Sequence, residues 1–437
     1  MSSIADSVQF AGKTDVGMRR LNNQDYFVPA PASDEAEWQS RGHIFIVADG
    51  MGGQAVGELA SKLAATTIVH SYRKLKSLDL ASALEEAFRE GNEVVHRKAK
   101  ANPEFEGMGT TATALVLHEQ GAFVGHVGDS RAYRIRNGVI EQLSCDHSLA
   151  WELARAKQIS DEQAGAIVPK NVITRSLGPE EKVLVDIEGP YEVREGDIFV
   201  LCSDGLSGQV QPEEIAVIAS TLPPDEAAER LVDLANLRGG SDNITVLIVR
   251  ANRALGRQTH SLARRLKDAL VRYVLSYLLE PRSLRRGGEL AIIGGVVGMI
   301  GGVLFRRFGI SGWHVPLISG VLLAALGAVA FLSARAAERF LKSRLRPFHN
   351  EPYRRHTFSV DAEVIAPWNN VLDEFRDLAV EQSWPVDWET YYEAKQRFAE
   401  ALKEGEFQEA VHRFAECIRH LAEAQKRRRK AELRHSV

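Results

Sequence analysis

Five aspartates lie in short segments that combine an acidic side chain with glycine, serine or asparagine. The segments are Arg20–Asp25, Val47–Gly53, Val127–Arg131, Leu201–Gly205 and Gly239–Asn243. Several of them directly follow or precede runs of β-branched and aromatic residues, which predict strands. Carboxylates on loops at the ends of strands are expected at a sheet edge, where they suit a site better than a core. The chain must therefore fold so that acidic turns gather beside a sheet.

The first 250 residues predict a mixture of strands and helices. Amphipathic periodicity predicts two helices, over Gly57–Leu75 and Leu80–Ala99. Short apolar runs rich in β-branched and aromatic residues predict strands at His43–Ala48, Ala112–His118, Gly121–Val127, Asp197–Cys202 and Ile244–Val249.

The acidic turns favour a metal site. Carboxylate and backbone carbonyl oxygens are the hard ligands that Mg²⁺ and Mn²⁺ prefer. Glycine beside an aspartate lets backbone and ligand approach closely. Two such ions about 3.5–4 Å apart can activate a water for in-line attack on a phosphoryl group. A single Asp-Gly at a strand end is usually only a turn, but five such segments in one region favour the site.

Eight motifs follow one another in a fixed order. They are Arg-x-x-Asn-Gln-Asp (20–25), Asp-Gly-Met-Gly-Gly (49–53), Gly-Thr-Thr (109–111), Val-Gly-Asp-Ser-Arg (127–131), Asp-His-Ser (146–148), Ile-Thr-Arg-Ser-Leu-Gly (173–178), Ser-Asp-Gly (203–205) and Ser-Asp-Asn-Ile-Thr (241–245). Each motif alone is a weak signal, but the ordered set is specific. It resembles the metal-dependent protein serine/threonine phosphatases of the PPM or type 2C family, in their bacterial form. The resemblance covers about residues 8–250.

The resemblance implies an α+β fold, an αββα sandwich in which helices flank two central antiparallel sheets. It places the metal site in a cleft at one edge, with two Mn²⁺ or Mg²⁺ ions and a weaker third position. Asp49 would bridge the two ions, and the Gly50 carbonyl would bind one of them. Asp204 and Asp242 would bind the other ion. Asp129 matches the position that helps to hold the third.

The same resemblance assigns roles around the ions. Arg20 would bind the substrate phosphate through two hydrogen bonds, and Asp25 would hold metal-bound waters. Asn243 would border the site. Met51 and Gln24 stand where eukaryotic relatives carry histidine and glutamate. A metal-bound water is therefore the expected proton donor.

Two further residues near the motifs have competing interpretations. His147 begins the segment 147–178, which corresponds to the family's flap over the cleft. It is either catalytic or, as we favour, an anchor for the flap through a hydrogen bond. Cys202 is expected to be a small core residue. A cysteine phosphatase needs a Cys-x5-Arg loop, and no cysteine of this chain has an arginine six residues on.

Two apolar runs late in the chain predict a membrane hairpin. Leu290–Phe305 is uncharged over 16 residues, and Val315–Ala334 is uncharged over 20 residues. A spanning helix needs about 20 apolar residues, so the second run is long enough and the first is marginal. A buried hairpin in a soluble protein is the alternative. Five cations at positions 335–346 and three at 282–286 flank the runs, which predicts that both flanks face the cytoplasm.

The two halves of the chain differ in net charge, which suggests that they have different tasks. Residues 1–250 carry 24 Lys+Arg and 37 Asp+Glu, a net −13, whereas residues 251–437 carry 30 and 21, a net +9. This pattern excludes a uniformly basic nucleic-acid binder and an acidic disordered chain. The three cysteines form no Cys-x-x-Cys pair, which favours a reducing compartment. The N-terminus shows no signal-peptide pattern.

The region after the apolar runs is expected to be helical. Trp388–Lys426 predicts two helices broken near Gly405, and Gly405–Ile418 resembles the second helix of a tetratricopeptide repeat. Either a partner-docking module or an ordinary helical hairpin fits. The basic cluster Lys426–Lys430 fits a solvated tail or a contact with anionic lipid.

These observations predict four regions: a phosphatase domain at 1–252, a basic amphipathic segment at 253–288, two spans at 289–335, and a cytoplasmic helical region at 336–437. The expected function is metal-dependent hydrolysis of phosphoserine and phosphothreonine on proteins, at the cytoplasmic membrane. The expected substrates are targets of a serine/threonine kinase, and no nucleic acid is involved. The alternatives are a non-catalytic membrane adaptor that senses a phosphoprotein, and a phosphatase devoted to one regulatory partner.

Overall fold

The computed structural model describes residues 7–53, 55–157, 163, 167–169, 172–255, 307 and 351–435. The predicted basic segment and both predicted spans lie outside the described residues, apart from residues 253–255 and Arg307 between the spans. None of the helices in the described ranges has both the length and the apolar character needed to cross a membrane. The ranges 7–255 and 351–435 belong to one compact unit.

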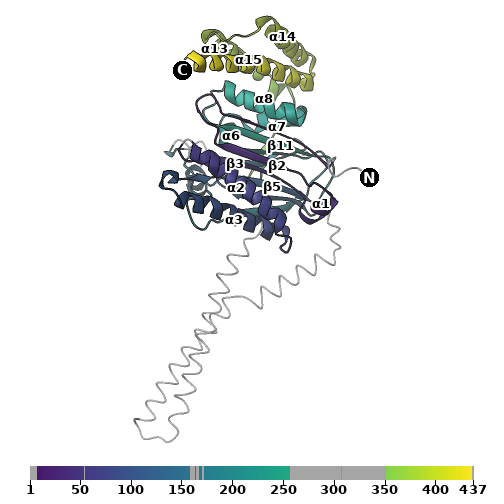
Figure 1. Cartoon of the computed structure of the whole chain (residues 1–437). Helices are drawn as coiled ribbons and strands as arrows, with labels where there is room; N and C mark the ends of the chain where they lie inside the picture. The colour runs from purple at the N-terminus through teal and green to yellow at the C-terminus, as the bar shows by residue number, and fades with distance from the viewer. Residues whose placement is uncertain are drawn as a thin grey trace. The chain divides into compact units, whose positions relative to one another are not determined.

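Two antiparallel sheets form the centre of this unit (Figure 1). The first sheet has the strand order β1-β11-β10-β7-β8-β12. Its strands are β1 (Val8–Asp15), β7 (Arg131–Arg136), β8 (Val139–Gln142), β10 (Ile198–Cys202), β11 (Ile244–Ala251) and β12 (Arg354–Thr357). The second sheet has the order β2-β3-β5-β6-β9, with the short β4 paired to β3. Its strands are β2 (Asp25–Ala30), β3 (His43–Met51), β4 (Gly109–Thr110), β5 (Ala112–His118), β6 (Gly121–Val127) and β9 (Asp186–Tyr191).

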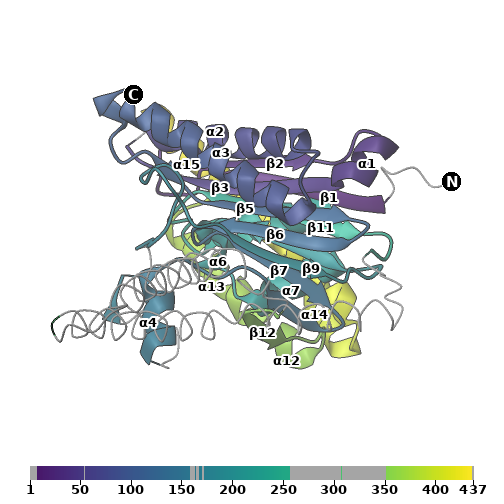
Figure 2. The same ribbon diagram turned by 90° about the horizontal axis from the view of Figure 1, so that it is seen from below.

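Helices cover the outer faces of both sheets. On the second sheet, α2 (Ala55–Lys74) and α3 (Leu80–Lys100) bury Ile68, Leu84 and Phe88 against the strands (Figure 2). On the first sheet, α7 (Pro212–Thr221) and α8 (Pro224–Leu237) bury a second cluster. A third cluster, with Phe45, Leu115 and Leu247, fills the space between the sheets. Helix α1 (Glu35–Arg41), the 3-10 turn η2 (Pro103–Phe105), α4 (Leu149–Lys157) and α6 (Asp204–Ser207) complete this part.

The αββα arrangement confirms the predicted sandwich. The strands predicted from β-branched runs are present, with ends shifted by up to three residues. These strands are buried on both faces, which is why their sequences read as continuous apolar runs. The prediction missed β1, β2, β7, β8 and β9. In β7, Arg131, Arg134 and Arg136 interrupt the apolar residues, which hides a largely buried strand.

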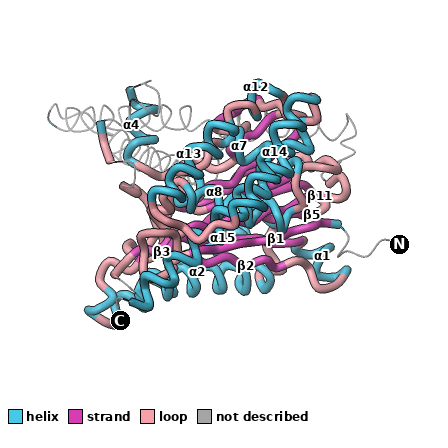
Figure 3. The backbone as a smooth tube through the Cα atoms, turned by 90° about the horizontal axis from the view of Figure 1, so that it is seen from above, coloured by secondary structure: helices cyan, strands magenta, loops and turns pink. Residues whose placement is uncertain are grey.

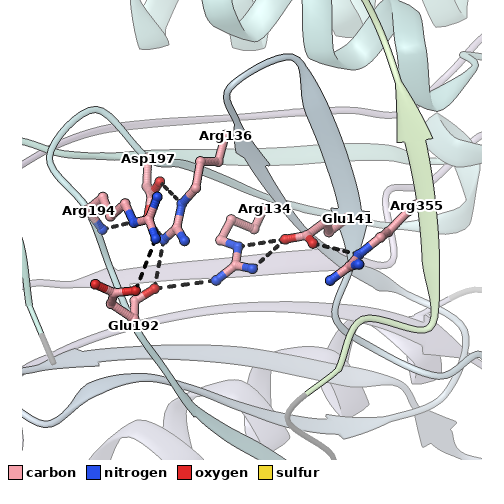
Figure 4. Close-up of polar contacts among 7 residues, drawn as sticks. All are labelled: Arg134, Arg136, Glu141, Glu192, Arg194, Asp197 and Arg355. Carbon is pink, nitrogen blue, oxygen red and sulfur yellow. Dashed lines mark hydrogen bonds and ion pairs between the residues drawn. The ribbon is translucent and has the colours of Figure 1, made fainter.

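The last part of the chain joins the first sheet directly. Strand β12 pairs antiparallel with β8, from Arg354 opposite Gln142 to Thr357 opposite Val139. Figure 4 shows Arg355 of β12 donating to Glu141, which also accepts from Arg134 of β7. Strand β12 therefore extends the phosphatase sheet by one edge strand, in a region predicted to be separate.

Four helices follow β12: α12 (Ala362–Ile365), α13 (Trp368–Glu381), α14 (Trp388–Glu404) and α15 (Phe407–His435). Helices α14 and α15 confirm the predicted break, with Gly405 in the left-handed conformation (φ 76°) that favours glycine. Helix α15 packs on α8 and α7, and its Phe414 lies 4.3 Å from the Trp368 ring of α13 (ring centroids). The small and aromatic residues that resembled a partner-docking repeat are thus buried within the chain itself.

Candidate active site

The five aspartates come from both sheets and meet at one edge of the sandwich. Asp25 begins β2 and Asp49 lies near the end of β3, and the two are direct partners in the antiparallel register. Asp129 follows β6, in the same sheet. From the other sheet, Asp204 begins α6 after β10, and Asp242 precedes β11. The structure therefore brings together every carboxylate that the sequence predicted for the site.

The aspartates are close enough to perturb one another. Burial raises the pKa of Asp49 well above its usual value, and the charges of Asp25, Asp204, Asp129 and Asp242 raise it further. Burial likewise raises the pKa of Asp25 to about 7, although a hydrogen bond from Ser203 opposes the rise. Like charges that share a buried site resist simultaneous ionisation. A bound cation would therefore stabilise the ionised form of these carboxylates.

The pKa values of Asp129 and Asp204 are raised in the same way. Burial, followed by the charge of Asp204, raises the pKa of Asp129 to about 8. Burial and the charge of Asp242 raise the pKa of Asp204. Perturbed carboxylates gathered in this way are typical of functional sites.

Unsatisfied oxygens indicate that the residues fit divalent ions. In the described part of the chain, the buried Oδ1 atoms of Asp25, Asp129 and Asp204 have no hydrogen-bond partner. A Cβ on Gly50 would lie 2.0 Å from the Gly57 carbonyl oxygen, so only glycine fits there. No three acidic, histidine or cysteine side chains among the described residues enclose a single ion by themselves. Backbone carbonyls and water must complete the coordination, as hard cations commonly allow.

The predicted phosphate-binding arginine lies at this edge. Arg20 is exposed, and its Nη2 lies 2.7 Å from Asp242 Oδ2. Asn243 is buried and ties the neighbouring loop in place. Its amide donates to the carbonyl oxygens of Val16 and Asn22 at 3.0 Å each, and its Oδ1 accepts from the Gln24 N–H at 2.8 Å. Asn243 thus holds the loop that carries Arg20.

Sequence reasoning gave no role to three hydroxyl residues that fix the aspartates. Thr110 Oγ1 donates to the Asp49 carbonyl at 2.8 Å, and Thr111 Oγ1 accepts from the Asp49 N–H at 2.9 Å. Ser203 Oγ donates to Asp25 Oδ2 at 2.7 Å. Their only signal in the sequence is membership of the Gly-Thr-Thr and Ser-Asp-Gly motifs.

His147 makes anchoring contacts. Its Nδ1 accepts from the Gly128 N–H at 3.0 Å, and its Nε2 lies 3.0 Å from Asp186 Oδ2 and 2.9 Å from Arg175 Nη1. These partners join the start and the end of the flap segment to the sheet beside Asp129. The geometry thus favours the anchoring interpretation over the catalytic one.

Cys202 lies in the interior. It is completely buried, and burial raises the pKa of its thiol to about 12. A thiol in that state is not a nucleophile at neutral pH.

Comparison with known proteins indicates the same family that the ordered motifs resemble. The family model described as protein phosphatase 2C matches residues 14–159. A putative protein phosphatase 2C-type of Streptococcus pyogenes is 36% identical over 241 residues, which cover 54% of this chain and 95% of that protein. The chain belongs to the protein phosphatase 2C family. It is a serine/threonine protein phosphatase of the bacterial kind.

Other relatives agree over the same region. The serine/threonine protein phosphatase PstP of Mycobacterium tuberculosis is 34% identical over 249 residues, which cover 57% of this chain and 46% of that protein. A structure of the PstP catalytic domain in complex with two manganese ions is 32% identical, with a TM-score of 0.48, and covers 57% of this chain and 98% of that one. Phosphatases of this family use Mn²⁺ or Mg²⁺.

Proposed function

We propose that this chain removes phosphate from phosphoserine and phosphothreonine on proteins by direct hydrolysis. Two Mn²⁺ or Mg²⁺ ions would be held by Asp49, the Gly50 carbonyl, Asp204 and Asp242, with Asp129 beside a weaker third position. Such ions supply an activated water and neutralise charge on the transferring phosphoryl group. The convergence of five aspartates from two sheets, with raised pKa values at Asp25, Asp49, Asp129 and Asp204, carries this proposal.

The chain's own residues supply binding and orientation. Arg20 would grip the substrate phosphate, and its present ion pair with Asp242 shows that its guanidinium reaches the carboxylate cluster. Asp25 would orient water, because Ser203 already holds one of its oxygens and leaves the other without a partner. Thr110 and Thr111 fix the backbone of Asp49 from two sides.

Turnover with and without metal tests the hydrolytic proposal. The purified full chain should release phosphate from a phosphothreonine peptide in Mn²⁺ or Mg²⁺ and lose that activity in excess EDTA, with recovery when Mn²⁺ is restored. Metal binding without turnover of any phosphopeptide would instead support the non-catalytic adaptor. Activity that survives EDTA would contradict the proposed metal dependence.

We further propose that the hairpin at 290–334 anchors the enzyme to the cytoplasmic membrane, with the phosphatase facing the cytoplasm. The uncharged runs and their flanking cations support this orientation. A hairpin is also compatible with the fold. Because residues on both sides of it belong to one compact unit, an anchor at this place would have to cross the membrane an even number of times. The natural substrates would then be targets of a cytoplasm-facing serine/threonine kinase.

Fractionation tests the anchor. The full chain should sediment with membranes and resist extraction by alkaline carbonate, whereas a variant lacking residues 288–335 should become soluble and keep its activity on p-nitrophenyl phosphate. If both proteins stay in the soluble fraction, the membrane proposal is wrong.

A further inference from the structure

The C-terminal end of α15 contacts the loop that carries Arg20 and helix α8. Arg429 Nη2 donates to the Arg20 carbonyl oxygen at 2.7 Å, across 409 positions of sequence. One turn earlier, Lys426 Nζ pairs with Asp233 Oδ1 at 2.8 Å. The loop that carries Arg20 is bound in turn to the loop that carries Asp242, since Met18 N–H donates to the Gly240 carbonyl at 2.7 Å. The basic cluster Lys426–Lys430 thus lies beside the proposed phosphate-binding arginine.

One face of this helix end remains open. Lys426 and Arg429 face the phosphatase, and Arg428 turns toward α13, where its Nη1 donates to Gln382. At helical spacing this leaves Arg427 and Lys430 as neighbours on the remaining face, where both are exposed. Within the described residues, neither of these two cations forms an ion pair or a side-chain hydrogen bond.

The charge on this face is positive beyond the two central cations. Arg434 lies two turns beyond Arg427 and is exposed. Off the helix, Arg19 is exposed as well and is the sequence neighbour of Arg20, whose carbonyl accepts from Arg429. The acidic exception is Glu423, one turn before Arg427. We refer to Arg19, Arg427, Lys430 and Arg434 as the basic rim.

We propose that the basic rim is a docking surface for acidic residues that flank the phosphorylated residue of a protein substrate. This inference rests on the proposed function, because it uses Arg20 as the point where the phosphate binds. A peptide held there extends by about 3.3 Å per residue, so its neighbours three to five positions away pass over adjacent surface. The basic rim begins at that surface and offers unpaired cations to glutamate and aspartate.

Position favours a peptide over a lipid headgroup. Arg429, on the same helix end as the basic rim, donates a hydrogen bond to the backbone carbonyl of Arg20 itself. Figure 3 shows the C-terminal end of α15 at the end of the unit opposite α1. Complementary surface charge raises encounter rate and selectivity, and salt weakens both.

Two matched phosphothreonine peptides test the proposal. One carries three glutamates on each side of the phosphothreonine, and the other carries glutamines at those positions. In 50 mM salt, the full chain should hydrolyse the glutamate peptide with a kcat/KM about tenfold higher. The preference should shrink in 0.5 M salt, where charges are screened over about 4 Å.

Charge reversal locates the preference. The variant R427E/K430E should reduce the preference to about one while leaving turnover of p-nitrophenyl phosphate unchanged, because that substrate has no flanking residues. The matched control is K74E/K76E, which reverses two exposed lysines at the C-terminal end of α2 and in the turn after it. It should keep the preference, because the end of α2 and the turn after it lie near α1, at the opposite end of the unit (Figure 3).

The outcomes separate this inference from the proposed function. If the wild-type chain turns over neither peptide nor p-nitrophenyl phosphate, the proposed function fails. If both peptides are hydrolysed equally, or if R427E/K430E keeps the preference, the docking surface is wrong. If R427E/K430E instead keeps the peptide preference and loses binding to phosphatidylserine vesicles, the basic rim is a lipid contact and the proposal is also wrong.

Discussion

At the scale of single residues, the carboxyl groups of the aspartate cluster bind protons that a metal ion would displace. With its pKa raised to about 7 in the absence of metal, Asp25 is substantially protonated at neutral pH, as is Asp129 with a pKa of about 8. In the unfolded chain both would ionise near pH 4. Without metal, the folded site therefore binds more protons than the unfolded chain between about pH 4 and 8. Over that window, these groups make the metal-free protein less stable as the pH rises.

The first prediction concerns metal affinity and pH. Because Mn²⁺ must displace the bound protons, its apparent affinity should rise with pH, by at least about tenfold between pH 6 and pH 8. Titration calorimetry in buffers of different ionisation enthalpy would report both the affinity and the protons released. An affinity that does not change over this range would contradict the raised pKa values.

The second prediction concerns Gly50. In Gly50→Ala the new Cβ would lie 2.0 Å from the Gly57 carbonyl oxygen and 2.6 Å from that of Gln24, so the backbone beside Asp49 must move. Activity should fall by about 100-fold, because displacement of reacting groups by about 1 Å has effects of that size. Gly53→Ala is the matched control, since a Cβ there meets nothing within 4 Å. Steady-state turnover of p-nitrophenyl phosphate compares the two.

The sequence allowed the acidic residues to be predicted but not the residues that support them. Asp49, Asp204 and Asp242 follow from the ordered motifs and from the chemistry of hard ligands. The link from Ser203 to Asp25 joins residues 178 positions apart. The contact of Arg429 with Arg20 joins still more distant residues. No local pattern reports such pairings, because they depend on how the two sheets and α15 are packed.

At the scale of elements, the contacts of α15 explain why residues 351–435 form part of the phosphatase unit. Phe414 is almost completely buried between Trp368 of α13 and Phe398 of α14. The same apolar cluster continues into Leu231 and Leu234 of α8. The helical periodicity of this region was predictable. Its docking was not, because the apolar stripe of α15 is equally suited to an external partner.

The third prediction tests the packing of α15. Phe414→Ala should lower the free energy of unfolding by about 3–5 kcal/mol, because it removes a large buried ring and leaves a cavity. Tyr392→Ala, which truncates a half-exposed ring of α14, should cost much less. Urea denaturation of the variant lacking residues 288–335 provides the measurement. Equal losses in the two variants would contradict the buried position of Phe414.

Strand β12 shows a second limit of sequence reasoning at this scale. Its four residues, Arg354–Thr357, carry three basic or polar side chains before the threonine and have no apolar alternation. They form a strand because β8 offers an open edge and because Glu141 accepts from Arg355. Edge pairing of this kind is decided by the partner strand rather than by the segment's own pattern.

At the scale of the whole molecule, two stretches of the chain that are far apart in sequence, 7–255 and 351–435, belong to one compact unit. The charge asymmetry suggested two halves with separate tasks. The described residues show a different division, in which residues 351–435 complete the unit begun by residues 7–255. The returning segment also contacts the flap, since the Arg354 guanidinium carbon lies 3.8 Å from the ring centroid of Trp151 in α4.

The fourth prediction follows from that division. A fragment of residues 1–257 would expose the apolar surface of α7 and α8 and the edge of β8. Its melting temperature should therefore lie more than about 5 °C below that of the variant lacking residues 288–335. Differential scanning calorimetry compares the two proteins. Equal melting temperatures would show that the C-terminal helices contribute nothing to the stability of the unit.

The central claim is that the aspartate cluster holds the metal ions that perform hydrolysis. The most direct measurement is phosphate release from a phosphothreonine peptide by the full chain carrying Asp49→Asn, at saturating Mn²⁺. This variant keeps the size of the side chain and the hydrogen bonds of the residue-49 backbone with the Thr110 and Thr111 hydroxyls, but removes the negative charge of the carboxylate. The account predicts a loss of at least about 1000-fold in kcat, with the fold intact by circular dichroism. Activity within a few-fold of the wild type would contradict it.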